Sequence, residues 1–174
     1  IFIMKTTLKI FALSVALFGI NNISFAQANT ATQNANAGAT IVTPISLVKN
    51  IDLNFGNIAA GASNFTVALS ATGTRTSSGG IGTLPSVTGT VAAAKFTASG
   101  LAEAQYSVSL PASPITISAG SGKDMTVSGF VADTDDKVLT GGSDEFTVGA
   151  TLNVKANQAA GAYTGTFNVT VAYE

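Results

Sequence analysis

The sequence predicts an all-β protein, an immunoglobulin-like antiparallel β-sandwich of roughly eight or nine strands. Its composition is poor in charged residues, at 10%, and rich in Thr, Ser, Ala and Gly, which suits strands and turns better than helices. Short alternations of apolar and polar residues recur about every 8 to 12 residues with turn residues between them, the spacing expected of a sandwich. No helical periodicity of useful length interrupts this pattern after residue 26.

The clearest alternation lies near the C-terminus. One strand is predicted over residues 146–156, where every second residue is apolar, and another over residues 163–173. Such a pair cannot shield two apolar faces alone, so the upstream chain must supply an opposing sheet. We expect these two strands to be the most buried of the domain. The residues assigned to the core or to an assembly contact of the final strand are Gly161, Tyr163, Phe167, Val169, Val171 and Tyr173.

Shorter strands are predicted upstream. Pro44 splits the first of them, which marks an edge strand or one that changes sheets. In the last, Met125, Val127 and Val131 share one face, Phe130 lies on the other, and Gly129 marks a bulge. Residues 71–90 are predicted to form a loop with one short irregular strand, because Thr, Ser and Gly dominate them. The expected strands are 41–47, 51–55, 65–69, 94–98, 106–110, 115–117 and 125–131.

The N-terminal residues follow the order of a secretory signal peptide. Lys5 and Lys9 flank the start of an apolar run at 10–20, and the small residues Ser24 and Ala26 come after it. The apolar run is too short for a spanning helix of about 20 residues. We therefore expect a signal peptide at 4–26, a disordered leader at 27–38 and a single sandwich domain at 39–174. The mature protein should start near Gln27, keep no transmembrane segment, and be secreted or held at the cell surface.

Charge and residue usage argue against several classes of function. Without Lys5 and Lys9, six basic residues face nine acidic ones, a net charge of −3 that argues against nucleic acid as a partner. The chain has no Cys and no His, which removes the Ser-His-Asp triad, the Cys-His pair and the usual zinc sites. The acidic residues lie mostly in predicted loops without Trp, which argues against a paired-carboxylate glycosidase. We therefore expect no catalytic residue, no metal and no cofactor.

Two loops carry residue types that bind ions or phosphate in other proteins. Residues 133–136, reinforced by Asp144 and Glu145, offer oxygen ligands for calcium, but Lys137 sits where another ligand is wanted. A solvated loop is the favoured interpretation there. The glycine-bearing stretch 73–80 lacks a Gly-Lys-Ser/Thr ending and a following helix, so it cannot hold phosphate in the manner of a P-loop.

Four segments follow a known family pattern in order along the chain. They are PISL at 44–47, DLNFGNI at 52–58, FTVGATLNV at 146–154 and GAYTGTFNVTVAYE at 161–174. Together they resemble the bacterial secreted family called domain of unknown function 4402, and the last two segments are the more specific. The resemblance implies an exported bacterial β-sandwich without an established activity, and it therefore supplies no catalytic residue.

The final strand is also similar to that of subunits of chaperone-usher pili. That strand ends in a penultimate aromatic residue and has a glycine fourteen positions from the terminus, and here Tyr173 and Gly161 hold those places. The pilins commonly carry a disulfide and a leader with large alternating apolar residues, and this chain has neither.

Two functions from different classes fit these observations. The first is structural: a pilin-like subunit of an extracellular fibre or coat, whose partners are other copies or other surface proteins and whose sheet edges pair by strand addition. The second is a self-contained, adhesin-like binding module that contacts a glycan or a protein through loops at one end of the sandwich. Size distribution at neutral pH discriminates between the two.

The leader at 27–38 is a poor candidate for a donor strand. Its small side chains contribute roughly 0.8 kcal/mol per buried methyl group, whereas ordering the backbone costs about 1 to 2 kcal/mol per residue. In one register the leader offers only Ala31, Ala35 and Ala37. We therefore expect a domain that folds alone, and any polymer to be built from sheet edges or end contacts instead of obligate leader exchange.

Overall fold

The computed structural model describes residues 30–80, 83–85, 89–133 and 137–174. The chain divides into two units, Ile1–Thr40 and Ile41–Glu174. In the first unit, residues 30–40 are exposed and form no helix or strand, and the predicted signal peptide lies outside the described residues. The second unit is all-β, which confirms the predicted fold class.

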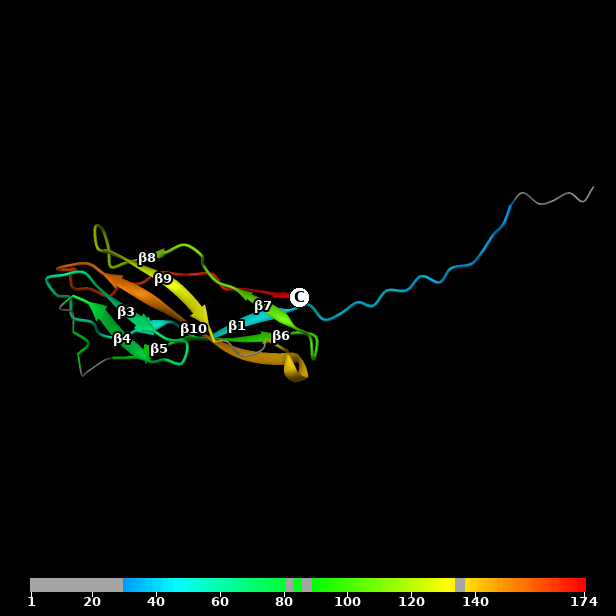
Figure 1. Ribbon diagram of the computed structural model, residues 1–174, viewed down its shortest axis with the longest axis horizontal. Helices are drawn as coiled ribbons and strands as arrows, with labels where there is room; N and C mark the ends of the chain where they lie inside the picture. The colour runs from blue at the N-terminus through cyan, green and yellow to red at the C-terminus, as the bar shows by residue number, and fades with distance from the viewer. Residues whose placement is uncertain (1–29, 81–82, 86–88, 134–136) are drawn as a thin grey trace, which may run out of the picture. The chain divides into compact units, whose positions relative to one another are not determined.

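The described residues contain eleven strands and a single turn of 3-10 helix at Thr140–Gly142 (Figure 1). The count exceeds the predicted eight or nine mainly because two of the strands, β2 and β5, are only two residues long. The strands are β1 (Ser46–Ile51), β2 (Asn54–Phe55), β3 (Phe65–Leu69), β4 (Arg75–Gly79), β5 (Val91–Ala92), β6 (Ala94–Ser99), β7 (Tyr106–Ser109), β8 (Ile115–Ser118), β9 (Asp124–Ala132), β10 (Ser143–Val154) and β11 (Thr170–Tyr173).

The longest strand, β10, connects the two halves of a seven-stranded sheet (Figure 1). Along one edge, its first half pairs with β6 and its second half with β3, while β9 pairs along its other edge. From there the sheet continues from β6 to β1, from β3 to β4 and from β9 to β8, always antiparallel. β10 is therefore the strand on which the whole sheet is built.

Gly149 lies where β10 changes partners from β6 to β3. A Cβ atom at this position would lie 2.3 Å from the carbonyl oxygen of Leu69 and 2.5 Å from the carbonyl carbon of Ser70, closer than real Cβ atoms come to such atoms. Because glycine has no side chain, the end of β3 can pass directly against β10. Position 149, which faces away from the core, therefore requires glycine.

Two apolar clusters lie along the inner face of β10. The first half of the strand packs with β6, Tyr106 and Leu139, and the second half packs with β3 and β9. Side chains from β7 and β11 lie against the first cluster and side chains from β2 and β5 against the second, so two small sheets form the second layer of a sandwich. Five of the six residues that the alternation over 146–156 placed in the core are buried: Phe146, Val148, Ala150, Leu152 and Val154. The sixth, Ala156, lies beyond the end of β10 at Val154 and is half-buried.

One predicted face, that of β9, is wrong beyond Gly129. The register against β10 gains one residue here, and Gly129 has a φ of +59°, so the predicted bulge is confirmed. Before the bulge, Met125 and Val127 are buried as predicted. After it the alternation reverses phase, so Phe130 packs against both core clusters while Val131 is 52% exposed. An inserted residue moves every later side chain to the opposite face, which the sequence pattern alone did not show.

The N-terminal strand is shifted from its predicted position. It was expected at 41–47, but β1 begins at Ser46, after Pro44, and continues to Ile51. Proline has no N–H to donate and favours an extended residue before it, so the ladder starts only beyond it. β1 is the terminal strand of its sheet, as predicted, since it pairs only with β6. The predicted loop at 71–90 contains β4, its one short strand among the described residues.

Candidate assembly surface

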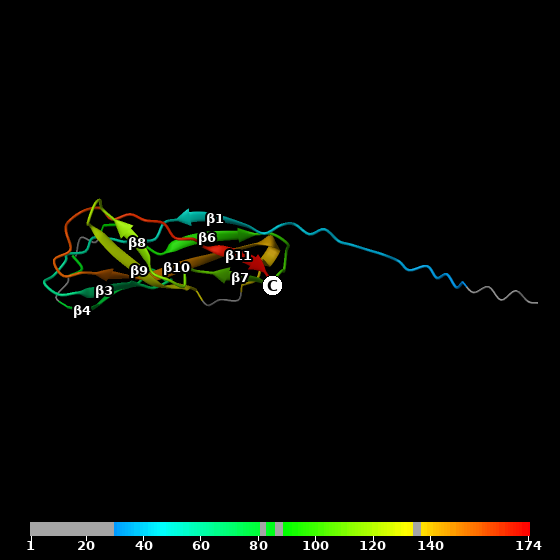
Figure 2. The same cartoon turned by 90° about the horizontal axis from the view of Figure 1, so that it is seen from above.

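The C-terminal strand is shorter and more exposed than predicted. It forms β11 only over Thr170–Tyr173, where it pairs with β7 (Figure 2). The prediction that it is among the most buried strands is wrong, because it lies in a two-stranded sheet whose outer edge no strand of the described chain pairs. The predicted alternation is nevertheless present, since the intervening residues are exposed. The half-buried residues are Tyr163, Phe167, Val169, Val171 and Tyr173.

Tyr173 ties the two ends of the domain together. Its hydroxyl donates to the carbonyl oxygen of Thr43 at 2.7 Å and accepts from the backbone N–H of Leu101 at 2.7 Å. Gly100 makes this possible, because a Cβ at that position would lie 2.1 Å from the tyrosine oxygen. The penultimate aromatic residue therefore anchors the chain just before β1. The sequence had no signal for Thr43, Gly100 or Leu101 as its partners.

The upstream end of the C-terminal strand is held by Tyr163. Its hydroxyl donates to the carbonyl oxygen of Ala159 and accepts from Gln158 Nε2, both at 2.7 Å. Thr164 then exchanges two backbone hydrogen bonds with Ser118, at the end of β8. Gly161, which was assigned to the core or to an assembly contact, is exposed. A Cβ at this position would lie 2.9 Å from the Cβ of Ala119, so close packing against Ala119 favours glycine here.

Residues 165–169, which we call the unpaired stretch, lie between these two anchor points. Within the described structure, none of them makes a main-chain hydrogen bond to another residue. Such N–H and C=O groups at the edge of a sheet are the template on which a further strand can pair. The unpaired stretch is thus the candidate site of strand addition.

The chain opposite the unpaired stretch explains why the ladder fails there. Residues 110–117 lie between the paired residues Ser109 and Ser118, whereas only residues 165–169 lie between their partners Thr170 and Thr164. The longer side contains Pro111 and Pro114, which have no N–H to donate. The two chains therefore cannot pair residue by residue, and no ladder forms between these two anchor points.

Apolar side chains support the unpaired stretch from beneath. The ring of Phe167 packs against that of Phe130, with centroids 4.9 Å apart, and Val169 packs against the first core cluster. Gly165 allows close approach to the neighbouring chain, because a Cβ there would lie 2.7 Å from the carbonyl oxygen of Thr116. Free main-chain groups above half-buried apolar side chains are what strand addition requires.

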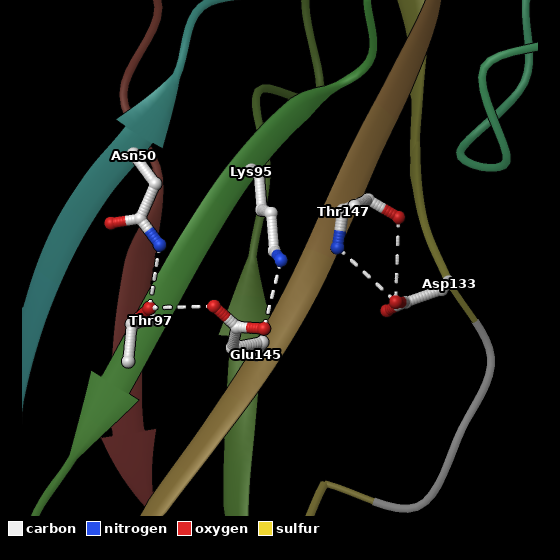
Figure 3. A network of polar contacts seen from close by, with 6 residues as sticks. All are labelled: Asn50, Lys95, Thr97, Asp133, Glu145 and Thr147. Atoms are coloured by element: carbon white, nitrogen blue, oxygen red, sulfur yellow. Dashed lines mark hydrogen bonds and ion pairs between the residues drawn. The ribbon is translucent and has the colours of Figure 1, made fainter.

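The outer face of β1, β6 and β10 carries a polar network (Figure 3). Lys95 forms an ion pair with Glu145 at 2.8 Å, and Thr97 joins Glu145 to Asn50, whose Nδ2 donates to the Thr97 hydroxyl at 2.7 Å. The hydrogen bond and charge of Lys95 lower the pKa of Glu145. These groups satisfy one another at the surface, and exposed ion pairs of this kind contribute little to stability.

The acidic residues weighed as calcium ligands are already engaged by protein groups. Asp133 forms an ion pair with Lys137 at 2.6 Å. It also accepts a hydrogen bond from the backbone N–H of Thr147 at 3.1 Å (Figure 3). Asp144 accepts the hydroxyl of Tyr106 at 2.7 Å, and Glu145 pairs with Lys95. The predicted cluster also includes residues 134–136, which lie outside the described residues. No group of three potential metal ligands gathers in the part of the chain that is described.

Among the described residues, Tyr106 is the buried one whose pKa is strongly shifted. Burial first, and then its hydrogen bond to Asp144, raise the pKa of its hydroxyl. The side chain is 1% exposed and lies under Phe146, so it belongs to the core. The interaction is structural, because Tyr106 lies in the buried cluster with Phe146.

Two further features bear on a binding role. A shallow hollow of about 450 Å³ lies over β3, β4, β9 and β10, but the amides of Asn64 and Asn153 at its rim already bond to Ala156 and Thr126. Arg75, within the glycine-bearing stretch, donates to the carbonyl oxygens of Phe55 at 2.7 Å and Asn57 at 2.9 Å and so fastens β4 to the end of β2 and the chain after it. The side-chain amides at the rim of the hollow and the guanidinium of Arg75 are thus engaged within the protein.

A family model described as a domain of unknown function (DUF4402) matches residues 45–173. No curated protein and no solved structure matches the chain. No helix in the described part of the chain is long and apolar enough to cross a membrane.

Proposed function

Because the chain belongs to the family of domains of unknown function DUF4402, we propose its role from its geometry: an exported, non-catalytic structural protein, a pilin-like subunit of an extracellular fibre or coat. Copies of the protein would join by pairing sheet edges. Export rests on the sequence of residues 4–26, whose order is that of a signal peptide.

The unpaired stretch is the observation that carries this proposal. Five consecutive residues of the described chain have free main-chain groups, and Phe167 and Val169 beneath them are only half-buried. Natural sheets usually protect an edge with a charged residue, a bulge or a covering segment. Residues 165–169 carry no charge, and an added strand would pair with the outward main-chain groups of residues 165, 167 and 169 and cover the apolar side chains.

The adhesin-like alternative finds less support. A glycan site needs aromatic faces or converging polar groups, and the amides at the rim of the hollow over β3 and β4 are already bonded within the protein. The polar network on the outer face is likewise internally paired. Strand addition is therefore the function that the geometry supports best.

The test is the size distribution of protein that begins near Gln27, measured by sedimentation velocity and electron microscopy at neutral pH. We expect concentration-dependent oligomers or fibres. A sharp monomer at every concentration would contradict the proposal. Val169→Pro should weaken association, because the N–H of Val169 points to the outer edge, on the side opposite to the paired main-chain groups of Thr164 and Thr170. Val169→Ala is the matched control, since it shortens the same side chain and keeps the N–H.

A second test concerns folding without the leader. Deletion of residues 27–38 should leave a soluble domain that unfolds cooperatively, because strands β1 to β11 all lie outside the deleted segment. Aggregation that is rescued by adding residues 27–38 as a peptide would instead show that the leader is an obligatory donor strand.

A further inference from the structure

We propose that the C-terminal strand pairs with the same strand of a second copy, antiparallel across a twofold axis, and so joins copies two at a time. This inference rests on the proposed function and names the partner of its site. The surface involved is the outer edge of residues 165–173, which we call the C-terminal edge.

The main-chain groups of the C-terminal edge belong to the odd-numbered residues. Thr164 exchanges backbone hydrogen bonds with Ser118, and the N–H of Glu174 donates to the carbonyl oxygen of Gln105. The even-numbered residues therefore face the neighbouring chain, and the groups of the residues between them point to the other side. The outward groups, none of which is hydrogen-bonded within the described chain, are those of residues 165, 167, 169, 171 and 173.

This edge is complementary to itself in an antiparallel register centred on Val169. With Val169 on the twofold axis, each odd-numbered residue lies opposite an odd-numbered residue of the second copy, so all five pairs can exchange hydrogen bonds. On the inner face, Phe167 then lies beside Val171 of the second copy. Both are half-buried, and the pairing would cover their exposed parts. On the outer face, the exposed Asn168 lies beside the exposed Thr170, so polar side chains meet polar side chains.

Two other outer strands, β1 and β4, are less suited to such a contact. β1 has an irregular register between Lys49 and Ile51 and exposes the Lys49 side chain, two features that hinder a further strand. β4 offers only Thr, Ser and Gly after Arg75, so a strand added there would bury little apolar surface. Residues 165–173 carry no charge, so two copies of the C-terminal edge do not repel each other.

The contact is isologous, because both copies contribute the same surface, and it closes with two copies. The dimer would then be the unit from which a fibre or coat is built through a second contact. The smallest associated species in the size distribution should therefore be a dimer.

Charges placed at Asn168 and Thr170 test the register, because both side chains are exposed and lie opposite each other across the axis. The double variant Asn168→Asp, Thr170→Asp should weaken dimerisation about two- to thirtyfold, since two like-charged pairs then oppose it. The double variant Asn168→Lys, Thr170→Lys should weaken it similarly. An equimolar mixture of the two should associate at least as well as wild type, as mixed dimers. Asn168→Ala, Thr170→Ala is the matched control, because it removes the same side chains without adding charge and should leave dimerisation unchanged.

Disulfide cross-linking measures the register directly, because the chain has no cysteine. Directly opposite residues that do not exchange hydrogen bonds have Cα atoms about 4.5 Å apart, within reach of a disulfide. On oxidation, Thr166→Cys protein mixed with Ala172→Cys protein should form mixed dimers, since the two exposed positions lie opposite each other. Thr166→Cys mixed with Asn168→Cys is the control, because these positions are about 13 Å apart along the paired strands and should not link.

The outcomes separate the two proposals. A wild-type protein that stays monomeric contradicts the proposed function and this pairing with it. Wild-type oligomers that are unaffected by both charged double variants overturn the pairing alone. Mixed disulfides in the out-of-register control, or none between Thr166→Cys and Ala172→Cys, would overturn the register on which the pairing rests.

Discussion

Replacing Gly149 with alanine should be among the most damaging single-methyl additions to this domain. The new Cβ would lie 2.3 Å from the Leu69 carbonyl oxygen, 2.5 Å from the Ser70 carbonyl carbon and 2.6 Å from the Ala71 nitrogen. All three are backbone atoms, so no side chain can rotate away, and the end of β3 must move by about 1 Å. Overpacking of a core costs about 1 to 3 kcal/mol, and we expect the upper end of that range.

Urea unfolding followed by circular dichroism measures this cost. A loss of about 3 kcal/mol lowers the midpoint by about 1 to 3 M, since the slope for small proteins is about 1 to 3 kcal/mol per molar urea. Gly38→Ala is the neutral control, because no atom lies within 4 Å of its Cβ. Gly129→Ala isolates backbone strain, since its φ is +59° and the nearest atom lies at 3.7 Å. It should cost about 1 kcal/mol. If Gly149→Ala is no worse than Gly129→Ala, β3 does not end against β10 in the way described.

Three further predictions concern the core, the buried tyrosine and export. Leu152→Ala should cost about 2 to 5 kcal/mol, because Leu152 is 2% exposed, while Phe167→Ala should cost only about 1 to 2 kcal/mol, because its ring is half-buried. Tyr106→Phe should cost about 1 to 3 kcal/mol at pH 8, because the Asp144 carboxylate loses its donor. Burial and that hydrogen bond raise the pKa of Tyr106 in the folded protein. The hydroxyl therefore stabilises the fold fully below about pH 10, the pKa of an unfolded tyrosine, and loses this contribution as the pH rises further. Above that pH, the difference in unfolding free energy between wild type and Tyr106→Phe should narrow. Mass spectrometry of secreted protein should find an N-terminus near Gln27.

Each of these has a clear contrary outcome. Equal losses for Leu152→Ala and Phe167→Ala in the same urea assay would mean that the C-terminal strand is as buried as β10. A stability difference between wild type and Tyr106→Phe that stays constant from pH 8 to pH 11 would contradict the raised pKa. Soluble exported protein that still begins at Met4 would count decisively against cleavage.

The fold class and the most buried strand could be predicted from the sequence because they depend on local alternation. In β10, five apolar residues at a spacing of two required one buried face, and all five are buried. The bulge at Gly129 was also predictable from its residue type. Its effect on the next residues was not, because the sequence shows where glycine stands but not that the ladder gains a residue there. Phe130 and Val131 therefore exchanged faces.

The candidate site shows the same division between local pattern and tertiary pairing. The alternation from Tyr163 to Tyr173 correctly identified which side chains face inward, since that depends only on the pleat of an extended chain. The depth of burial depends on neighbours that are remote in sequence. The prolines at 111 and 114 interrupt the ladder opposite residues 165–169, and Tyr173 bonds to Thr43, 130 residues away. The sequence by itself thus determined the strands and their inward faces, and only the tertiary structure decided which strand edge was left without a partner.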